Sequence, residues 1–246
     1  MKLNIHNIFI ALTLILACTE LIAQEQKITE LWKKEPSKVL TNEIGTPPSD
    51  AVVLFDGTNL SNFSSPDRSE PTWIIEDGYM MVNVKSRKGI LTKQKFGSCQ
   101  LHIEWMTPIQ DLDSGQLKGN SGIFFMDRYE VQILDSWENK TYSNGQASSI
   151  YKQHIPLVNA SKKPGEWQVY DIVFTAPQFS DSGTLISPAR FTIFHNGVLV
   201  QNNVSLLGQT RFVGMPYYEK HDIKEPLFIQ NHGDEVSFRN IWVREL

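Results

Sequence analysis

Short runs of alternating apolar and polar residues follow one another from residue 51 to the C-terminus, and turn residues end each run. A two-residue period is typical of strands buried on one face, because successive side chains point to opposite sides. Asp77-Gly78 and Asn196-Gly197 are turn pairs that join neighbouring runs into hairpins. The pattern predicts strands at residues 52–55, 73–75, 79–84, 100–106, 122–126, 129–134, 167–174, 190–195, 198–200, 227–230 and 236–243.

These runs favour an all-β fold, since no helical period persists over three turns after the N-terminal segment. Strands separated by turns about every 8–12 residues predict one domain over residues 51–246, a two-sheet antiparallel jelly-roll sandwich. Residues 24–50 are polar and contain prolines, which predicts an extended lead-in. Two long segments, 141–165 and 203–226, are rich in Asn, Pro, Gly and aromatic residues. Long loops in compact domains are usually functional or disordered, and the aromatic content favours the rim of a site.

The first 23 residues, 1–23, predict a Sec-type signal peptide. Lys2 supplies the positive charge, residues 8–17 are apolar, and Ala23 is a small residue suited to cleavage. The apolar run is shorter than the roughly 20 residues that a membrane-spanning helix needs. No later run is longer, so we expect no transmembrane segment and a periplasmic or secreted protein.

Cysteine content and charge narrow the class further. Cys18 follows Ala17 and offers the alternative of a lipoprotein anchor, which the bulky Leu16 disfavours. Cleavage after Ala23 leaves only Cys99, so we expect no internal disulfide and a fold that depends on its apolar core. The formal net charge is −4 and there is no basic run, which argues against nucleic acid as a partner.

The densest polar chemistry lies in one stretch, residues 118–136. In a strand, Glu130 and Gln132 point to one face, while Tyr129, Val131 and Ile133 point to the other. A buried charge needs a partner, whereas a carboxylate and an amide on an open face can hold sugar hydroxyls. The alternative is a plain solvated face.

Other candidates are scattered along the chain. His102 and Glu104 share a strand face, Asp135 has the opposite parity to Glu130, and His232 lies close to the C-terminal strand. The motifs GxSxG and HExxH and zinc-type Cys/His spacing are absent. A paired-carboxylate glycosidase motif is also absent. From the residues alone we expect a secreted β-sandwich with a polar, aromatic cleft.

Longer strings point to one family. The strings are VLFDGTNLSNF (53–63), LHIEW (101–105), GNSGIFF (119–125), RYEVQILDS (128–136), IYKQHIPLVNASKKPGEWQVYDIVF (150–174), PARFTIFHNGVLVQN (188–202), QNHG (230–233) and FRNIWVREL (238–246). Over about residues 50–246 the chain resembles the 3-keto-glucoside 1,2-lyase/3-keto-2-hydroxy-glucal hydratase family, earlier labelled a 3-keto-disaccharide hydrolase domain.

The resemblance implies a concanavalin A-like fold and a carbohydrate partner. It implies cleavage of 3-keto-glucosides by elimination, or hydration of the resulting 3-keto-2-hydroxy-glucal. With that chemistry, Glu130 or Asp135 is the expected base and His232 the expected acid or enolate stabiliser. The expected substrate-binding residues and charge partners are Glu104, Asn120, Arg128, Gln132, Tyr151, Trp167, Gln230 and Arg239.

Two departures from the family pattern bear on this expectation. Met106 stands where the family commonly has Arg, and Asn231 replaces an aspartate before His232. Two other functions remain open: a non-catalytic carbohydrate-binding module, and a hydrolytic glucanase of the same fold. No cofactor is implied with certainty, and dependence on a divalent metal stays open.

Overall fold

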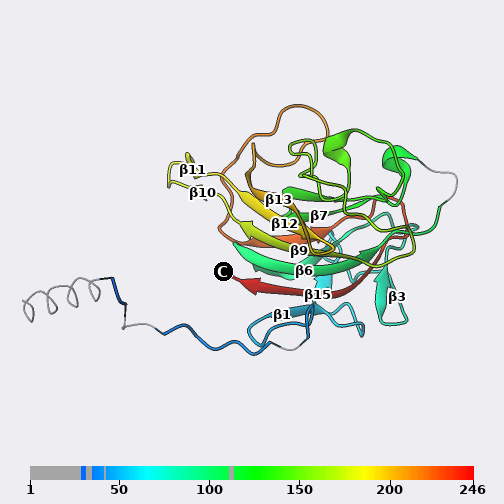
Figure 1. Ribbon diagram of the computed structural model, residues 1–246, viewed down its shortest axis with the longest axis horizontal. Helices are drawn as coiled ribbons and strands as arrows, with labels where there is room; N and C mark the ends of the chain where they lie inside the picture. The colour runs from blue at the N-terminus through cyan, green and yellow to red at the C-terminus, as the bar shows by residue number, and fades with distance from the viewer. Residues whose placement is uncertain (1–28, 32–34, 42, 111–113) are drawn as a thin grey trace, which may run out of the picture. The chain divides into compact units, whose positions relative to one another are not determined.

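The computed structural model describes residues 29–31, 35–41, 43–110 and 114–246 (Figure 1). The expected signal peptide and Cys18 lie outside these residues. The chain separates into two compact units, Met1–Val39 and Leu40–Leu246. All the strands described below belong to the second unit.

The larger of two main sheets has eight antiparallel strands in the order β13-β12-β9-β6-β15-β4-β3, with β1 also paired to β15. Its strands are β1 (Val52–Phe55), β3 (Ile74–Glu76), β4 (Tyr79–Met81), β6 (Cys99–Met106), β9 (Gln168–Thr175), β12 (Arg190–His195), β13 (Val198–Ser205) and β15 (Ser237–Glu245).

The smaller sheet has five strands in the order β2-β5-β14-β7-β8. They are β2 (Phe63–Ser64), β5 (Ile90–Phe96), β7 (Ser121–Phe125), β8 (Tyr129–Ile133) and β14 (Glu225–Ile229). A separate hairpin and two short 3₁₀ turns complete the described elements: β10 (Gln178–Phe179), β11 (Leu185–Ser187), η1 (Gly115–Leu117) and η2 (Ser143–Gly145).

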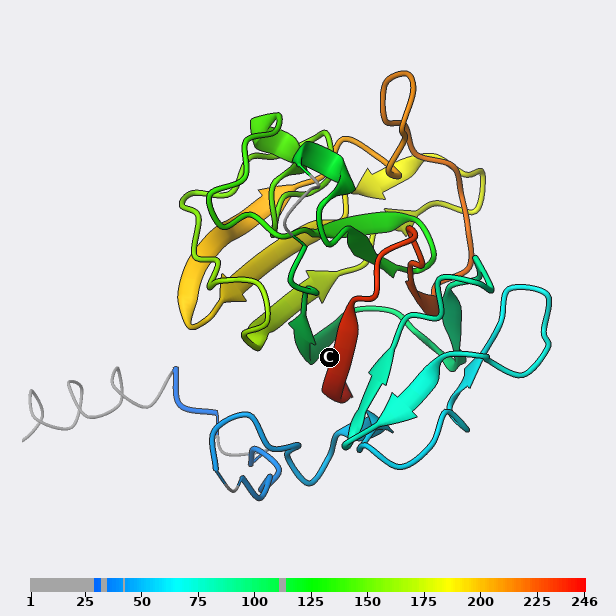
Figure 2. The same ribbon diagram turned by 90° about the vertical axis from the view of Figure 1, so that its right-hand side faces the viewer.

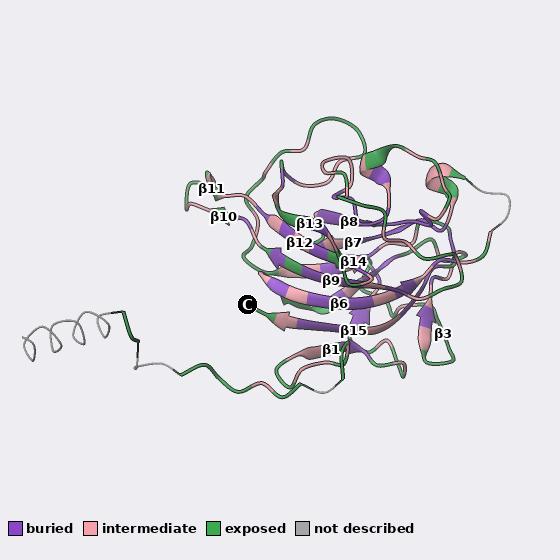
Figure 3. Ribbon diagram, viewed as in Figure 1, coloured by how far each residue is buried: buried purple, intermediate pink, exposed green. Residues whose placement is uncertain are grey.

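The two sheets pack through aromatic side chains. Phe125 of the smaller sheet contacts Phe174 and Phe191 of the larger one, with ring centroids 4.9 and 5.0 Å apart. Tyr129 also contacts Phe174, at 5.9 Å. In β9 and β12 the residues that face this layer are buried, and they alternate with partly or fully exposed residues (Figure 3). The predicted all-β sandwich is therefore confirmed, since aromatic and β-branched residues alternate toward one shared core.

Most expected strands form, and their bounds differ by a few residues. The pattern missed β5, because Lys93, Gln94 and Lys95 are consecutive exposed residues that hide its two-residue period. It also missed β2, β10 and β11, which have only two or three residues each. The segment after β13, drawn in orange, is a long loop that projects from the sheets (Figure 2).

The end of the expected lead-in contacts the larger sheet. The carbonyl of Gly45 accepts hydrogen bonds from Asn240 Nδ2 at 2.9 Å and Trp242 Nε1 at 3.0 Å. Arg244 donates to Asp50 at 2.6 Å. Residues 43–50, the last part of the lead-in expected to be extended, therefore include turns and are fixed to β15.

Candidate active site

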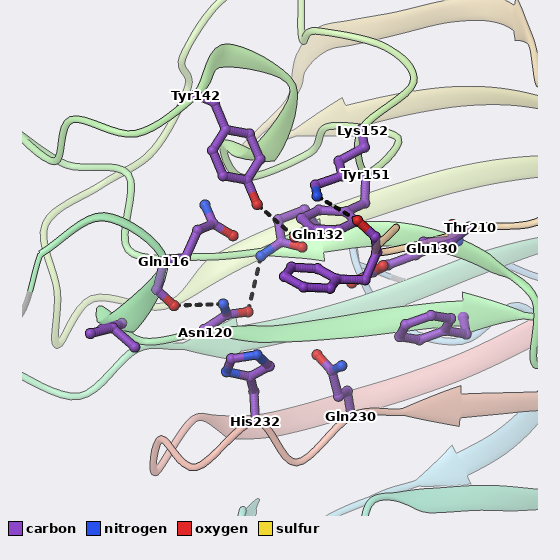
Figure 4. A pocket seen from close by; sticks show the side chains of 13 residues that line it. Gln116, Asn120, Glu130, Gln132, Tyr142, Tyr151, Lys152, Thr210, Gln230 and His232 are labelled. Carbon is purple, nitrogen blue, oxygen red and sulfur yellow. Dashed lines mark hydrogen bonds between the residues drawn. The ribbon is translucent and has the colours of Figure 1, made fainter. Parts of the chain in front are cut away.

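A pocket of about 670 Å³ opens on the face of the smaller sheet that points away from the core (Figure 4). This volume is in the range of sites for small ligands. Side chains come from η1, β7 and the residue before it, β8, the segment after β14 and both long loops. They are Gln116, Leu117, Asn120, Phe124, Glu130, Gln132, Tyr142, Tyr151, Lys152, Thr210, Phe212, Gln230 and His232.

Among the residues that the structure describes, Glu130 is the only carboxylate that lines the pocket, and its side chain is nearly enclosed. The residue is 5% exposed, and the described residues contain no ion pair to its carboxylate. Loss of water around the charged form raises the pKa of Glu130 to about 8. A carboxyl group with such a pKa can both accept and release a proton near neutral pH.

Gly122 makes the room that the Glu130 side chain occupies. A Cβ atom at Gly122 would lie 2.6 Å from Glu130 Oε1 and 3.2 Å from its Cγ. Gly122 is paired across the ladder with Gln132, so the gap opens beside both polar side chains of β8. Gly122, the second glycine of the GNSGIFF string, therefore lets the Glu130 carboxyl group lie flat against the sheet.

An amide chain runs along the pocket floor. Gln132 Nε2 donates to Asn120 Oδ1 at 3.0 Å, and Asn120 Nδ2 donates to the Gln116 carbonyl at 2.7 Å. The Asn120 backbone N–H donates to Asp234 at 2.7 Å, which fixes this residue further. Gln132 Oε1 is buried without a protein hydrogen-bond partner. Because such an acceptor is costly to leave unpaired, it is suited to a ligand hydroxyl.

The long loops supply an aromatic rim. The hydroxyls of Tyr142 and Tyr151 are 2.6 Å apart. Burial, the hydrogen bond shared with Tyr142 and the nearby Glu130 carboxylate all raise the pKa of Tyr151, so its hydroxyl stays protonated. Lys152 donates to the carbonyl of Phe212 at 2.7 Å and lies 4.2 Å from that ring's centroid.

The segment after β14 closes the other side of the pocket, where Gln230 and His232 lie (Figure 4). The Gln230 backbone N–H donates to the Gly122 carbonyl at 2.9 Å. Asn231 Nδ2 donates to the Asn83 carbonyl at 2.9 Å, and its Oδ1 accepts from the Gly233 N–H at 3.1 Å. Asn231 thus holds the turn beside β4, and an aspartate could not make the bond to Asn83.

The structure brings six of the expected site residues to one pocket: Glu130, Asn120, Gln132, Tyr151, Gln230 and His232. Three other expected residues lie on the outer face of the larger sheet. Arg239 Nε donates to Glu104 at 2.6 Å, and the Arg239 guanidinium lies 4.1 Å from the centroid of the Trp167 ring. Glu104, Trp167 and Arg239 thus pair with one another and do not line the pocket.

Asp135 and Arg128 also lie outside the pocket lining. Asp135 is buried, its carboxylate is 3.1 Å from Lys118 Nζ, and it accepts the N–H of Trp137 at 3.0 Å. It holds a turn, and of the expected carboxylates at Glu130 and Asp135 only Glu130 lines the pocket. Arg128 lines a neighbouring hollow, which shares Phe124, Thr210 and Phe212 with the pocket.

Several lining residues were not among the sequence candidates: Gln116, Tyr142, Lys152, Thr210 and Phe212. Tyr142 and the loop after β13 were noted as a rim, but nothing in the pattern singled out Lys152. Within the described part of the chain, no three His, Cys, Asp or Glu side chains are grouped to hold a metal ion. No helix among those residues is long and apolar enough to cross a membrane.

Comparisons with known proteins agree with the fold. A curated protein of Bacteroides thetaiotaomicron, named 3-keto-disaccharide hydrolase, is 24% identical over 79% of this chain and 78% of its own length. A crystal structure from Parabacteroides distasonis, provisionally named a glycosyl hydrolase, is 47% identical, with a TM-score of 0.84 over 89% of this chain and 96% of that one.

A second structure from that organism, with the same provisional name, shares the fold at 17% identity, with a TM-score of 0.57 over 80% of this chain and 94% of its own. The sequence profile of one family matches residues 50–244. The resemblance seen in the sequence is thereby confirmed. The chain belongs to the family described as the 3-keto-alpha-glucoside-1,2-lyase-like domain.

Proposed function

We propose that this carbohydrate-active domain cleaves 3-keto-glucosides by elimination, with Glu130 as the base that removes the proton from C2. The observation that carries the proposal is a nearly enclosed carboxyl group, without a cation partner among the described residues, in a pocket of sugar-binding size. Its pKa of about 8 suits a proton transfer near neutral pH.

The chemistry follows from the ketone. A carbonyl at C3 acidifies the hydrogen on C2, so Glu130 takes that proton and the C–H electron pair forms an enolate with charge on O3. The enolate then collapses to restore the C3 carbonyl, forms a C1–C2 double bond and expels the C1 oxygen with its electron pair. Hydration of the product is the same sequence reversed, with water adding at C1.

The remaining lining groups suit the needs of this route. His232 lies in the same pocket as Glu130 and is the residue that we assign to the enolate oxygen, where it donates a hydrogen bond. We assign the binding of sugar hydroxyls to the unpaired acceptor Gln132 Oε1 and to the amides of Asn120 and Gln230, which line the same pocket. The protonated Tyr151 hydroxyl adds a further polar contact beside Glu130.

The two alternative functions receive less support. A conventional glucanase needs two carboxyl groups about 5–9 Å apart across the scissile bond, and Glu130 is the only carboxylate in the described lining. A non-catalytic binding module could hold sugar hydroxyls with a carboxylate on an open face, and it does not need a nearly enclosed one, because burial of that group without a partner costs free energy.

The test is an assay of the purified protein with a 3-keto-glucoside and with its unoxidised parent. We expect the 3-keto compound to yield the free leaving group and a 3-keto-2-hydroxy-glucal, and the parent to remain intact. Cleavage of the parent would indicate a glucanase. Saturable binding of both compounds without any product would indicate a binding module, and either result would overturn the proposal.

A further inference from the structure

Lys152 stands at the junction of two adjacent hollows. It lines the pocket that contains Glu130, and it also lines a second hollow of about 430 Å³. Tyr142 and Phe212 line both hollows as well. The second hollow is otherwise bounded by Asn144, Leu207, Arg211, Gly214, Met215 and Pro216. A ligand that passes from one hollow to the other therefore runs past the Lys152 side chain.

The Lys152 ammonium group is held in place without a carboxylate. Among the described residues it forms no ion pair. One N–H of the ammonium group donates a hydrogen bond to the Phe212 carbonyl, and the ring centroids of Tyr142 and Tyr151 both lie 5.8 Å from Nζ. An ammonium group has three donors, so others remain for a ligand oxygen.

The backbone of Lys152 is also unusual. Its φ is 59°, in the left-handed region that costs a non-glycine residue free energy. The surrounding contacts hold it there: its N–H donates to the Asn144 carbonyl at 2.8 Å. In Figure 4, Lys152 and Tyr142 lie on one side of the Asn120–Gln132 chain, while His232 lies on the other. With Lys152 on one side of the pocket and His232 on the other, the O1 and O3 atoms of a bound sugar can each have a separate proton donor.

We infer that Lys152 protonates the departing C1 oxygen, and that the adjoining hollow is a subsite for a leaving group with apolar or aromatic surface. The inference rests on the elimination proposed above. The C1–O bond breaks with its electrons going to oxygen, one Nζ–H bond breaks, and its proton goes to that oxygen. Glu130 keeps the proton from C2, and water later restores both groups.

The chemistry of the second hollow supports this class of leaving group. Leu207, Phe212 and Met215 are 56%, 74% and 76% exposed and lie on one loop beside the hollow. Large apolar side chains gathered at the mouth of a site indicate an apolar ligand surface. Arg211 belongs to the same loop and lines the hollow, and its guanidinium lies 4.7 Å from the ring centroid of Tyr217. A guanidinium group also attracts the face of an aromatic ligand ring.

The experiment compares Lys152→Met with the wild-type protein on 3-keto-glucosides that differ only in the leaving group. An alkoxide needs protonation as it departs, whereas a 4-nitrophenolate does not. We expect Lys152→Met to lower kcat for the methyl glycoside about 10²–10⁴-fold, and for the 4-nitrophenyl glycoside by about tenfold at most. The matched control is Lys163→Met, which removes an ammonium beside Trp137, outside the pocket lining.

Exchange of the C2 hydrogen with deuterated solvent separates the proposed elimination from the proposed role of Lys152. This exchange requires the base, Glu130, and does not require the acid, Lys152. If the wild-type protein catalyses neither exchange nor elimination, the proposed function is wrong. If it does both, but Lys152→Met loses the same factor on both leaving groups, the assignment of Lys152 alone is overturned.

A second variant keeps the subsite testable should Lys152→Met fail to fold. Met215→Ala shortens an exposed side chain that lines the second hollow and not the pocket, so its effect on folding is small. We expect it to raise KM for 3-keto-glucosides with an aryl leaving group several-fold and to leave KM for the methyl glycoside unchanged. Equal changes in KM for both substrates would overturn the subsite.

Discussion

Glu130 and Glu104 occupy comparable positions in the two sheets, yet their surroundings are opposite. Each glutamate lies on a strand between core residues, and its side chain points away from the core. Glu104 accepts hydrogen bonds from Arg239 at 2.6 Å and Asn240 at 2.9 Å. Glu130 has no such partner among the described residues and faces the pocket.

The difference appears in their proton affinities. Burial alone would raise the pKa of Glu104, but hydrogen bonds from Asn240 and Arg239 outweigh it and hold this pKa below its ordinary value. At Glu130 burial acts without opposition and raises the pKa to about 8. A partnered carboxylate is a permanent charge that stabilises the sheet, whereas the unpartnered one is poised to exchange a proton.

The largest effect that separates the two glutamates is on the reaction. Glu130→Gln keeps the shape of the side chain and removes the base, so we expect kcat for 3-keto-glucoside elimination to fall at least about 10²–10⁴-fold. Glu104→Gln is the matched control and should stay within about twofold of the wild-type rate, because Glu104 lies outside the pocket. Similar rates for the two variants in steady-state assays would contradict the assignment of Glu130, and not Glu104, as the base.

The next effect is on stability as a function of pH. The pKa of Glu130 is raised from 4.5 to about 8 in the folded protein. The stability that its protonated form contributes is therefore fully present below pH 4.5 and is lost as the pH rises to 8. In this window the free energy of unfolding of the wild-type protein should fall relative to Glu130→Gln, with a slope of up to about 1.4 kcal/mol per pH unit.

Urea unfolding of both proteins at pH 5 and pH 8 checks this slope. Glu104→Gln again serves as the comparison, because folding shifts the pKa of Glu104 downward, in the direction opposite to that of Glu130. The Glu104 carboxylate stabilises the fold above its unfolded pKa, and that contribution disappears as the pH falls through the folded value. Parallel stability curves for wild type and Glu130→Gln would show that Glu130 is not held protonated by burial.

The smallest effect concerns the pairing on the larger sheet. Arg239→Met removes the hydrogen bond to Glu104 and the contact with the Trp167 ring. Because Arg239 is well exposed and Asn240 still bonds Glu104, we expect a loss of about 0.5–1 kcal/mol in the free energy of unfolding. Elimination should continue at the wild-type rate, and a large fall in kcat would place this cluster in the reaction.

The sequence predicted the faces of individual strands well, and for a physical reason. The two-residue period requires Glu130 and Gln132 to point away from Tyr129, and the structure has this arrangement. The period says nothing about which sheet a strand joins. Arg239 follows Gln230 closely in the chain, but the chain crosses from β14 of the smaller sheet to β15 of the larger one between them.

Loop residues were the hardest to predict. Lys152 reaches the pocket through a left-handed backbone conformation and contacts with Phe212, which is distant in the sequence. Neither feature has a local signal in the chain. The role of Gly122 was also hidden, because its importance depends on where the Glu130 carboxyl group lies.

The most direct measurement is the pH dependence of deuterium loss from C2 of a 2-deuterated 3-keto-glucoside. If Glu130 is the base, the rate should rise about tenfold per pH unit below pH 8, level off near the raised pKa of about 8, and vanish in Glu130→Gln. A plateau that begins near pH 4.5, the ordinary carboxyl value, or exchange that persists in Glu130→Gln, would contradict the account.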